Sequence, residues 1–146
     1  MATFSRSTTV NWAGSIMEGG GTAEAGTGAF SLPVSFPKRI GDPAGATSPE
    51  EFIAAAHATC YAMVVAGALG RANASTSRTS VKCTVTADKG DAGIKITTSK
   101  LEVAVEGLTG MDAATFEAKV REAEGGCPVS NALRGALKIE VVVTVR

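Results

Sequence analysis

The chain has 146 residues, of which 45% are hydrophobic, and its 14 basic and 14 acidic side chains cancel to a net charge of zero. This length and composition predict a single domain over residues 1–146 with its own buried core. A neutral chain exerts no long-range attraction on nucleic acid or on an anionic membrane, so neither is an expected partner. The first 14 residues lack the continuous apolar run of a secretory signal, which predicts a cytoplasmic protein.

The chain contains three cysteines and one histidine and has no CxxC pair. A four-ligand zinc site built from these side chains alone would use every sulphur in the chain. We therefore expect no metal and no other cofactor.

The N-terminal forty residues predict short strands, with extended segments at residues 4–12 and 28–36 and a flexible glycine turn at residues 19–21. Residues 37–43 break this pattern and predict a loop. The clearest helix start follows, with Ser48 as the N-cap, Pro49 at the first helical position and Glu51 completing a capping box. The helix is expected to reach Leu69, with Gly70 as its left-handed terminator.

No charged residue occurs between Phe52 and Leu69. A helix that is apolar on every face is expected to be buried on nearly all sides. A transmembrane segment is the alternative, but alanine is only weakly apolar, His57 and Thr59 lie in mid-segment, and the flanking strands look like those of a soluble protein. One small domain cannot cover such a helix all round, so we expect a second copy of the chain to cover part of it.

After residue 70 the pattern alternates, which predicts a strand at 81–88, a turn at 90–93 and a partner strand at 94–105 with an irregularity near 98–100. A helix from Asp112 to about Glu124, a short helical start at Pro128 and a strand at 137–145 complete the chain. This order predicts an α+β fold in which an antiparallel sheet packs against the long central helix and a second helix.

The three cysteines occupy different settings. Cys83 lies on the apolar phase of its strand, which is typical of a small buried hydrophobic residue. Cys60 lies at the centre of the uncharged helix, where burial raises the pKa of a thiol and favours an inert, structural role. Cys127 precedes a proline-led helix start, where backbone N–H groups favour the thiolate. These settings alone leave structural and redox roles open.

Two segments carry a resemblance to a known family. Residues 47–63, TSPEEFIAAAHATCYAM, and residues 126–133, GCPVSNAL, resemble the osmotically inducible protein C / organic hydroperoxide resistance (OsmC/Ohr) family, and the similarity covers essentially the whole chain. The resemblance implies an intertwined α+β homodimer with active sites at the subunit interface. It also implies a thiol-dependent peroxidase that reduces organic hydroperoxides to alcohols.

Residue by residue, the resemblance makes Cys60 the peroxidatic thiol and Cys127 the resolving thiol. Arg39 matches the catalytic arginine, and its position in the loop before the helix favours the osmotically inducible branch of the family. Glu50 matches the carboxylate that holds this arginine. Thr59 and Tyr61 depart from the alanine and phenylalanine that are common beside the cysteine, which puts the shape of the pocket in question.

The implied reaction begins with attack of the Cys60 thiolate on the peroxide and departure of the alcohol. The sulphenic acid on Cys60 then condenses with Cys127 to form an intramolecular disulphide, and an external thiol or dithiol reopens it. A buried thiolate needs a nearby cation, which Arg39 would supply, and a buried guanidinium in turn needs a carboxylate such as Glu50.

Ten residues separate Glu50 from Cys60, which on a straight helix is a rise of about 15 Å. Glu50 and Arg39 therefore reach Cys60 either because Arg39 bridges this gap or because both come from the other subunit. The sequence leaves these two arrangements open.

Two other functions compete with peroxidase activity. His57 and Cys60 lie three residues apart on one helical face, a spacing that suits a Cys/His-dependent hydrolase. A non-catalytic thiol redox sensor would use the same disulphide as a signal. Turnover with a recycled reductant distinguishes an enzyme from such a sensor.

Overall fold

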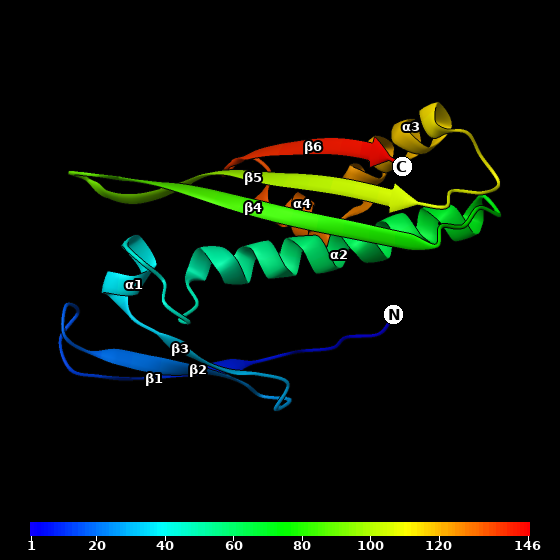
Figure 1. The fold of residues 1–146 in the computed structure, drawn as a ribbon. Helices are drawn as coiled ribbons and strands as arrows, with labels where there is room; N and C mark the ends of the chain where they lie inside the picture. The colour runs from blue at the N-terminus through cyan, green and yellow to red at the C-terminus, as the bar shows by residue number, and fades with distance from the viewer. The chain divides into compact units, whose positions relative to one another are not determined.

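The computed structural model describes all residues from 1 to 146 and has six strands and four α-helices, which confirms the α+β class (Figure 1). The strands form two three-stranded sheets. The chain divides into two compact units, Met1–Phe52 and Ile53–Arg146, which are described separately. A single domain over residues 1–146 stays a prediction.

The N-terminal unit contains an antiparallel sheet of β1 (Thr8–Ala13), β2 (Gly20–Ala25) and β3 (Ser31–Val34). The flexible turn expected at residues 19–21 is wrong, because β2 already begins at Gly20. A Cβ on Gly21 would lie 2.5 Å from the carbonyl oxygen of Asn11 on β1. Glycine at this position thus allows β1 and β2 to approach closely.

A short helix, α1 (Phe36–Ile40), replaces part of the loop that was expected after β3. The Ser35 side chain caps it by accepting a hydrogen bond from the backbone N–H of Lys38, and Pro37 lies in its first turn. Arg39 therefore lies on a helix, where sequence analysis expected a loop.

The long helix α2 (Pro49–Arg71) begins where the sequence predicts it. The hydroxyl of Ser48 accepts a hydrogen bond from the backbone N–H of Glu51 at 3.2 Å. The second bond of the predicted capping box, from the backbone N–H of Ser48 to the Glu51 carboxylate, is wrong. The carboxylate of Glu51 instead accepts a hydrogen bond from the hydroxyl of Thr47 at 2.8 Å. The N-cap alone defines the start.

The end of α2 lies beyond the predicted terminator Gly70. Asn73 is the residue with positive φ, at 52°. The N–H of Asn73 donates to the carbonyl of Gly70, and the N–H of Ala74 donates to the carbonyl of Leu69. These two bonds form a Schellman motif with asparagine at the left-handed position, a role that asparagine takes in place of glycine.

In the second unit, β5 (Gly93–Glu106) lies between β4 (Arg78–Gly90) and β6 (Lys138–Val145). β4 pairs with β5 in antiparallel register, and Thr97 is the unpaired residue of a bulge, just before the irregularity expected at 98–100. β6 runs parallel to β5, which differs from the antiparallel sheet expected. The helices between β5 and β6 return the chain to the starting end of β5, and such a crossover joins parallel strands.

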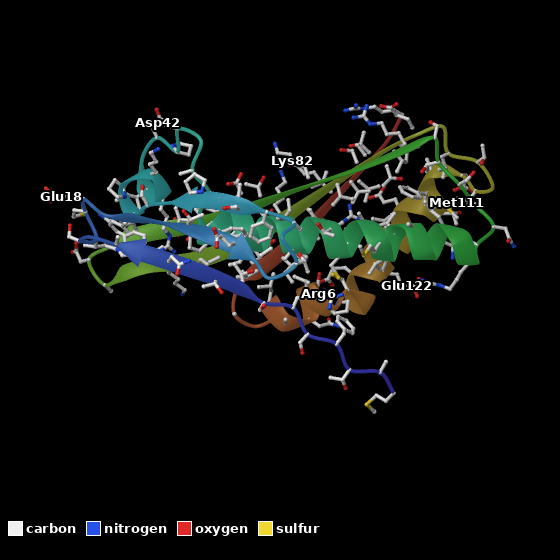
Figure 2. The ribbon with its side chains drawn as sticks, turned by 90° about the horizontal axis from the view of Figure 1, so that it is seen from below. Arg6, Glu18, Asp42, Lys82, Met111 and Glu122 are labelled. Carbon is white, nitrogen blue, oxygen red and sulfur yellow. The ribbon has the colours of Figure 1, made fainter.

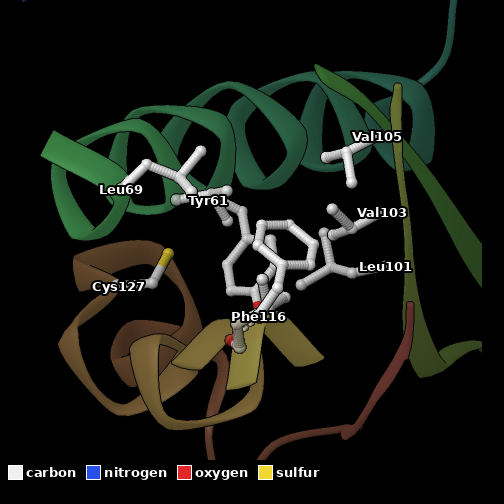
Figure 3. Close-up of a cluster of buried hydrophobic side chains, with 9 residues drawn as sticks. Tyr61, Leu69, Leu101, Val103, Val105, Phe116 and Cys127 are labelled. Atoms are coloured by element: carbon white, nitrogen blue, oxygen red, sulfur yellow. Dashed lines mark hydrogen bonds between the residues drawn. The ribbon is translucent and has the colours of Figure 1, made fainter. Parts of the chain in front are cut away.

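Those helices are α3 (Ala113–Ala123) and α4 (Pro128–Leu133), separated by the 3₁₀ turn η1 (Glu124–Gly126). Asp112 caps α3 through a 2.7 Å hydrogen bond from the N–H of Thr115. Side chains from α2, β5 and α3 converge in one core, with the Cys127 sulphur directed toward α2 (Figure 3). The fully buried members of this core are Tyr61, Val65, Leu101, Val103, Val105, Phe116, Val120 and Cys127.

Only one face of α2 is buried within a single chain, so burial on nearly all sides, with a second copy covering the rest, stays a prediction. Its buried residues are His57, Tyr61, Val65 and Leu69, spaced four apart. Although α2 is long and apolar enough to cross a membrane by length and composition, this stripe packs into the core as in the central helix of a globular fold. Charged side chains such as Lys82 and Glu122 lie on the outside (Figure 2).

Phe116 is 1% exposed at the centre of this core. We expect Phe116→Ala to lower the free energy of unfolding by about 3–5 kcal/mol, because a large buried ring leaves a cavity that its neighbours fill only partly. Urea denaturation measures this change, with Val142→Ala, at a position that is 42% exposed, as the control. A loss for Phe116→Ala no larger than that of the control would contradict this description of the core.

Candidate active site

Two of the predicted site residues meet inside the second unit. The sulphurs of Cys60, in the middle of α2, and Cys127, at the N-cap of α4, are 3.3 Å apart although 67 positions separate them in sequence. Both are free thiols. A disulphide bond is about 2.0 Å long, so a movement of little more than 1 Å would join the sulphurs.

The approach of the two sulphurs depends on how α3 is attached to α2. The Tyr61 hydroxyl, one residue after Cys60, donates a hydrogen bond to the backbone carbonyl of Val120 on α3. The chain then passes through η1 directly to Cys127. Tyr61 is fully buried, so its side chain belongs to the core rather than to a pocket wall.

The environment of Cys127 favours its thiolate. Burial works against the charge, because the residue is 0% exposed. The backbone N–H of Ser130 donates to the sulphur at 3.4 Å, and this contact together with the Ser130 side chain and the thiol of Cys60 holds the pKa of Cys127 below that of an ordinary thiol. Cys127 caps α4 with a sulphur in the role that serine usually takes.

Cys60 is partly exposed, and its environment differs from that of Cys127. Burial raises the pKa of the Cys60 thiol, and the neighbouring Cys127 raises it further, while the backbone N–H of Val129 acts in the opposite direction. Two sulphurs in contact hold a single negative charge more readily than two. Within this pair the hydrogen-bond donors favour the charge on Cys127, and a nearby cation would favour ionisation of Cys60.

The other two predicted site residues meet inside the N-terminal unit. Arg39 on α1 donates from Nε to both carboxylate oxygens of Glu50 at 3.1 Å, and its terminal nitrogen lies 2.5 Å from Oε1. This fork geometry suits the planar guanidinium. The bond to Arg39 holds the pKa of Glu50 below its usual value, and the bond to Glu50 raises the pKa of Arg39.

His57 makes contacts that the sequence did not reveal. It is 0% exposed, and its ring nitrogens lie 2.7 Å from the hydroxyls of Ser99 on β5 and Ser130 on α4. Both nitrogens are therefore engaged, and neither of these bonds goes to Cys60, which removes the geometric support for a Cys/His hydrolase. One sign of these contacts was present in the sequence. Ser99 is a polar residue at a buried position of its strand, in phase with Leu101 and Val103.

Cys83 on β4 packs against the edge of the core, as its apolar phase predicts. Its sulphur lies 3.2 Å from the Ser99 hydroxyl. Burial raises the pKa of Cys83, and its hydrogen bond with Ser99 only partly opposes this effect. Cys83 is thus held as a neutral thiol.

A groove of about 490 Å³ runs along α2 and α3 from the neighbourhood of the two sulphurs. Cys60 shares one flank of α2 with Val64, Gly67 and Arg71, which follow it by four, seven and eleven residues. These three residues line the groove together with Met63 and Gly126, the residue before Cys127. Lys119 and Glu122 also line it, so the groove combines apolar and charged side chains.

Comparison with known proteins agrees with this geometry. The model of the family described as OsmC-like protein matches residues 41–142. Peroxiredoxin OsmC of Escherichia coli K12 is 38% identical over 133 residues, covering 89% of this chain and 90% of its own, and organic hydroperoxide resistance protein-like 2 of Staphylococcus saprophyticus is 29% identical, with coverages of 80% and 81%. The crystal structure of an organic hydroperoxide resistance protein OsmC from Legionella pneumophila matches with a TM-score of 0.78 at 26% identity, covering 99% of both chains.

The ion pair between Arg39 and Glu50 makes a prediction about pH. Because the pKa of Glu50 in the folded protein is lowered, the pair stabilises the fold above the carboxyl's unfolded pKa, and this contribution is lost as the pH falls through the folded pKa. In Arg39→Met we expect the Glu50 pKa to rise to its usual value or above, since burial then acts unopposed by the guanidinium. Carboxyl NMR titration measures it, with Arg6→Met as the control, and an unchanged Glu50 pKa in Arg39→Met would show that the ion pair is absent in solution.

Proposed function

Since the chain belongs to the OsmC-like family, we propose that it reduces organic hydroperoxides through the Cys60–Cys127 pair described above. It is a cysteine-based peroxidase, and Cys60 is the attacking thiol while Cys127 resolves the oxidised product. The observation that carries this assignment is the 3.3 Å contact between two free sulphurs, one partly exposed and one fully buried. The exposed sulphur is the one that a peroxide can reach.

The reaction proceeds in three balanced steps. The Cys60 thiolate attacks the terminal peroxide oxygen, the O–O bond breaks, and the alkoxide leaves and takes up a proton to become an alcohol. Cys127 then attacks the sulphenic sulphur and displaces hydroxide, which becomes water, so that a disulphide joins the two residues. An external thiol or dithiol reopens this disulphide by exchange.

Arg39 and Glu50 supply the charge that Cys60 lacks among its own neighbours. A guanidinium beside the Cys60 sulphur would offset the burial that raises its pKa. The carboxylate of Glu50 holds the guanidinium plane through both Arg39 Nε contacts. A lysine at position 39 would bring a point charge without this fixed fork.

The groove beside Cys60 supports organic peroxides as the substrates. Met63, Val64, Gly67 and Ala68 form an apolar stretch of its α2 side, before the charged Arg71, and an alkyl chain can transfer from water onto this stretch. Hydrogen peroxide has no group that gains from this lining. Thr59 and Tyr61, which depart from the common family residues, do not line it.

We place the protein in the cytoplasm as a homodimer. A reducing compartment keeps the three thiols free and regenerates the disulphide. The outward face of α2, with Ala55, Thr59 and Met63, is free of charge, and Met63 is 70% exposed. A second copy of the chain would bury this face, and the helix would then be covered on all sides as its composition requires.

Cysteine variants test the chemistry. We expect Cys60→Ser to abolish peroxide reduction, because the serine hydroxyl is not ionised at neutral pH. Cys127→Ser is expected to complete one turnover and then to accumulate higher oxides of Cys60, because no thiol resolves the sulphenic acid. Peroxide consumption and intact mass measure both outcomes, with Cys83→Ser as the matched control that retains activity. Full activity of Cys60→Ser would refute the proposed function.

A mixing experiment tests whether each site combines Cys60 of one subunit with Glu50 of the other. Inactive Cys60→Ser and Glu50→Ala chains are refolded together in equal amounts. If the sites are shared, half of the dimers are mixed and each carries one intact site, which restores about a quarter of the wild-type activity. If each chain builds its own site, mixing restores nothing beyond the sum of the two separate proteins. Sedimentation at low micromolar concentration checks the assembly, and a fully active monomer would contradict the dimer.

A further inference from the structure

The buried histidine has no role in the steps described so far. His57 lies at 0% exposure and bonds to Ser99 and Ser130 through its two ring nitrogens. A polar group inside an apolar core contributes little to stability even when its hydrogen bonds are complete. The row ends beside the Cys127 sulphur, because the backbone N–H of Ser130 donates to that sulphur at 3.4 Å, and the Ser130 side chain also lowers the pKa of Cys127.

The direction of the hydrogen bonds along the row follows from the protonation of His57. Burial lowers its pKa, while the carboxylate of Glu124 raises it to a lesser extent, so the imidazole is neutral with one donor and one acceptor nitrogen. If Nε2 carries the proton, it donates to the Ser130 oxygen and leaves the Ser130 hydroxyl proton free for the Cys127 sulphur. The other tautomer directs that hydroxyl proton to the ring.

A thiolate on Cys127 therefore selects the tautomer with the proton on Nε2. Nδ1 then accepts from the Ser99 hydroxyl, and the Ser99 oxygen accepts from the thiol of Cys83, 3.2 Å away. Every donor finds an acceptor in this arrangement, and no buried side-chain nitrogen or oxygen lacks a partner. The titratable groups around the row are Cys60 and Tyr61 on α2, Cys83 on β4 and Glu124 on η1.

We propose that the row Ser99–His57–Ser130 holds Cys127 as the thiolate that resolves oxidised Cys60 and as the thiolate that leaves when the disulphide is reduced. Ser130 touches the reacting sulphur, whereas His57 and Ser99 are positioning residues that orient the Ser130 hydroxyl. This inference rests on the proposed function, and it gives a physical reason why the two cysteines have different roles.

The row also determines which sulphur the reductant attacks. Cys60 is partly exposed and Cys127 is fully buried, so an external thiolate reaches the Cys60 sulphur. The S–S bond then breaks with its electron pair on Cys127, where the Ser130 hydroxyl and N–H stabilise the charge. A mixed disulphide remains on Cys60, and a second external thiol releases it as free Cys60.

The direct test is a titration of Cys127 as the only thiol. In the Cys60→Ser, Cys83→Ser background, the ultraviolet absorbance of the thiolate gives its titration midpoint without any peroxide. Ser130→Ala and His57→Leu are each expected to raise this midpoint by about one pH unit or more, because a hydrogen bond to a charged group is lost or misdirected. The Cys83→Ser background keeps a hydroxyl donor toward Ser99 and therefore preserves the row.

His57→Gln is the matched control. A glutamine amide places its N–H near the position of Nε2, so it still donates to Ser130 and is expected to keep the midpoint within a few tenths of a pH unit. Identical midpoints in the parent, Ser130→Ala and His57→Leu proteins would overturn the proposal. If His57→Leu does not fold, Ser130→Ala decides, since this change removes only one hydroxyl and leaves the backbone N–H in place.

Stopped-flow kinetics in the otherwise wild-type chain separates this inference from the proposed function. Ser130→Ala is expected to slow disulphide formation about threefold or more, because the smaller thiolate fraction outweighs the gain in intrinsic nucleophilicity. The rate of peroxide attack by Cys60 is expected not to fall, because a charge that Cys127 holds less firmly is more available to Cys60. Equal disulphide formation rates would contradict the row's role. Absence of any reaction between wild-type Cys60 and peroxide would refute the proposed function and leave the titration result standing.

Discussion

The contact between two sulphurs inside an apolar core is the constraint on which the rest of the structure depends. Chemistry at Cys60 and Cys127 requires a negative charge at a place where burial disfavours it. At Cys127 the fold meets this requirement with hydrogen-bond donors from the first turn of α4. At Cys60 it provides one backbone N–H, from Val129, and a cation is the group that would add to this stabilisation. The Arg39–Glu50 ion pair is the group that we propose as its source.

The fold keeps the two sulphurs in contact through packing rather than through a covalent link. The buried stripe of α2 locks it against β5, and the bond from Tyr61 to the Val120 carbonyl ties α3 to α2. The 3₁₀ turn of η1 then delivers Cys127 to the N-cap of α4. Tyr61, a departure from the common phenylalanine, is accommodated because its hydroxyl has this partner. The core thus holds the two free thiols in contact.

Local signals in the sequence correctly predicted helix starts, because these depend on residues close together in the chain. Ser48 and Asp112 cap the helices that were expected there, and Cys127 precedes a helix led by Pro128. Contacts between distant segments were not predictable: β6 pairs in parallel with β5 because of the crossover before it, and His57 finds partners 42 and 73 positions away. The four site residues came from the family resemblance, since spacing alone left Cys60 as a structural residue. The structure brings them together as two pairs, and their catalytic roles stay predictions.

The most direct measurement of the central claim is the location of oxidised sulphur after a single turnover. The reduced protein is treated with one equivalent of cumene hydroperoxide, its remaining thiols are blocked, and its peptides are analysed by mass spectrometry. The account predicts a Cys60–Cys127 disulphide within one chain and an unmodified Cys83. Higher oxides on Cys60 with Cys127 still reduced, or oxidation centred on Cys83, would contradict it.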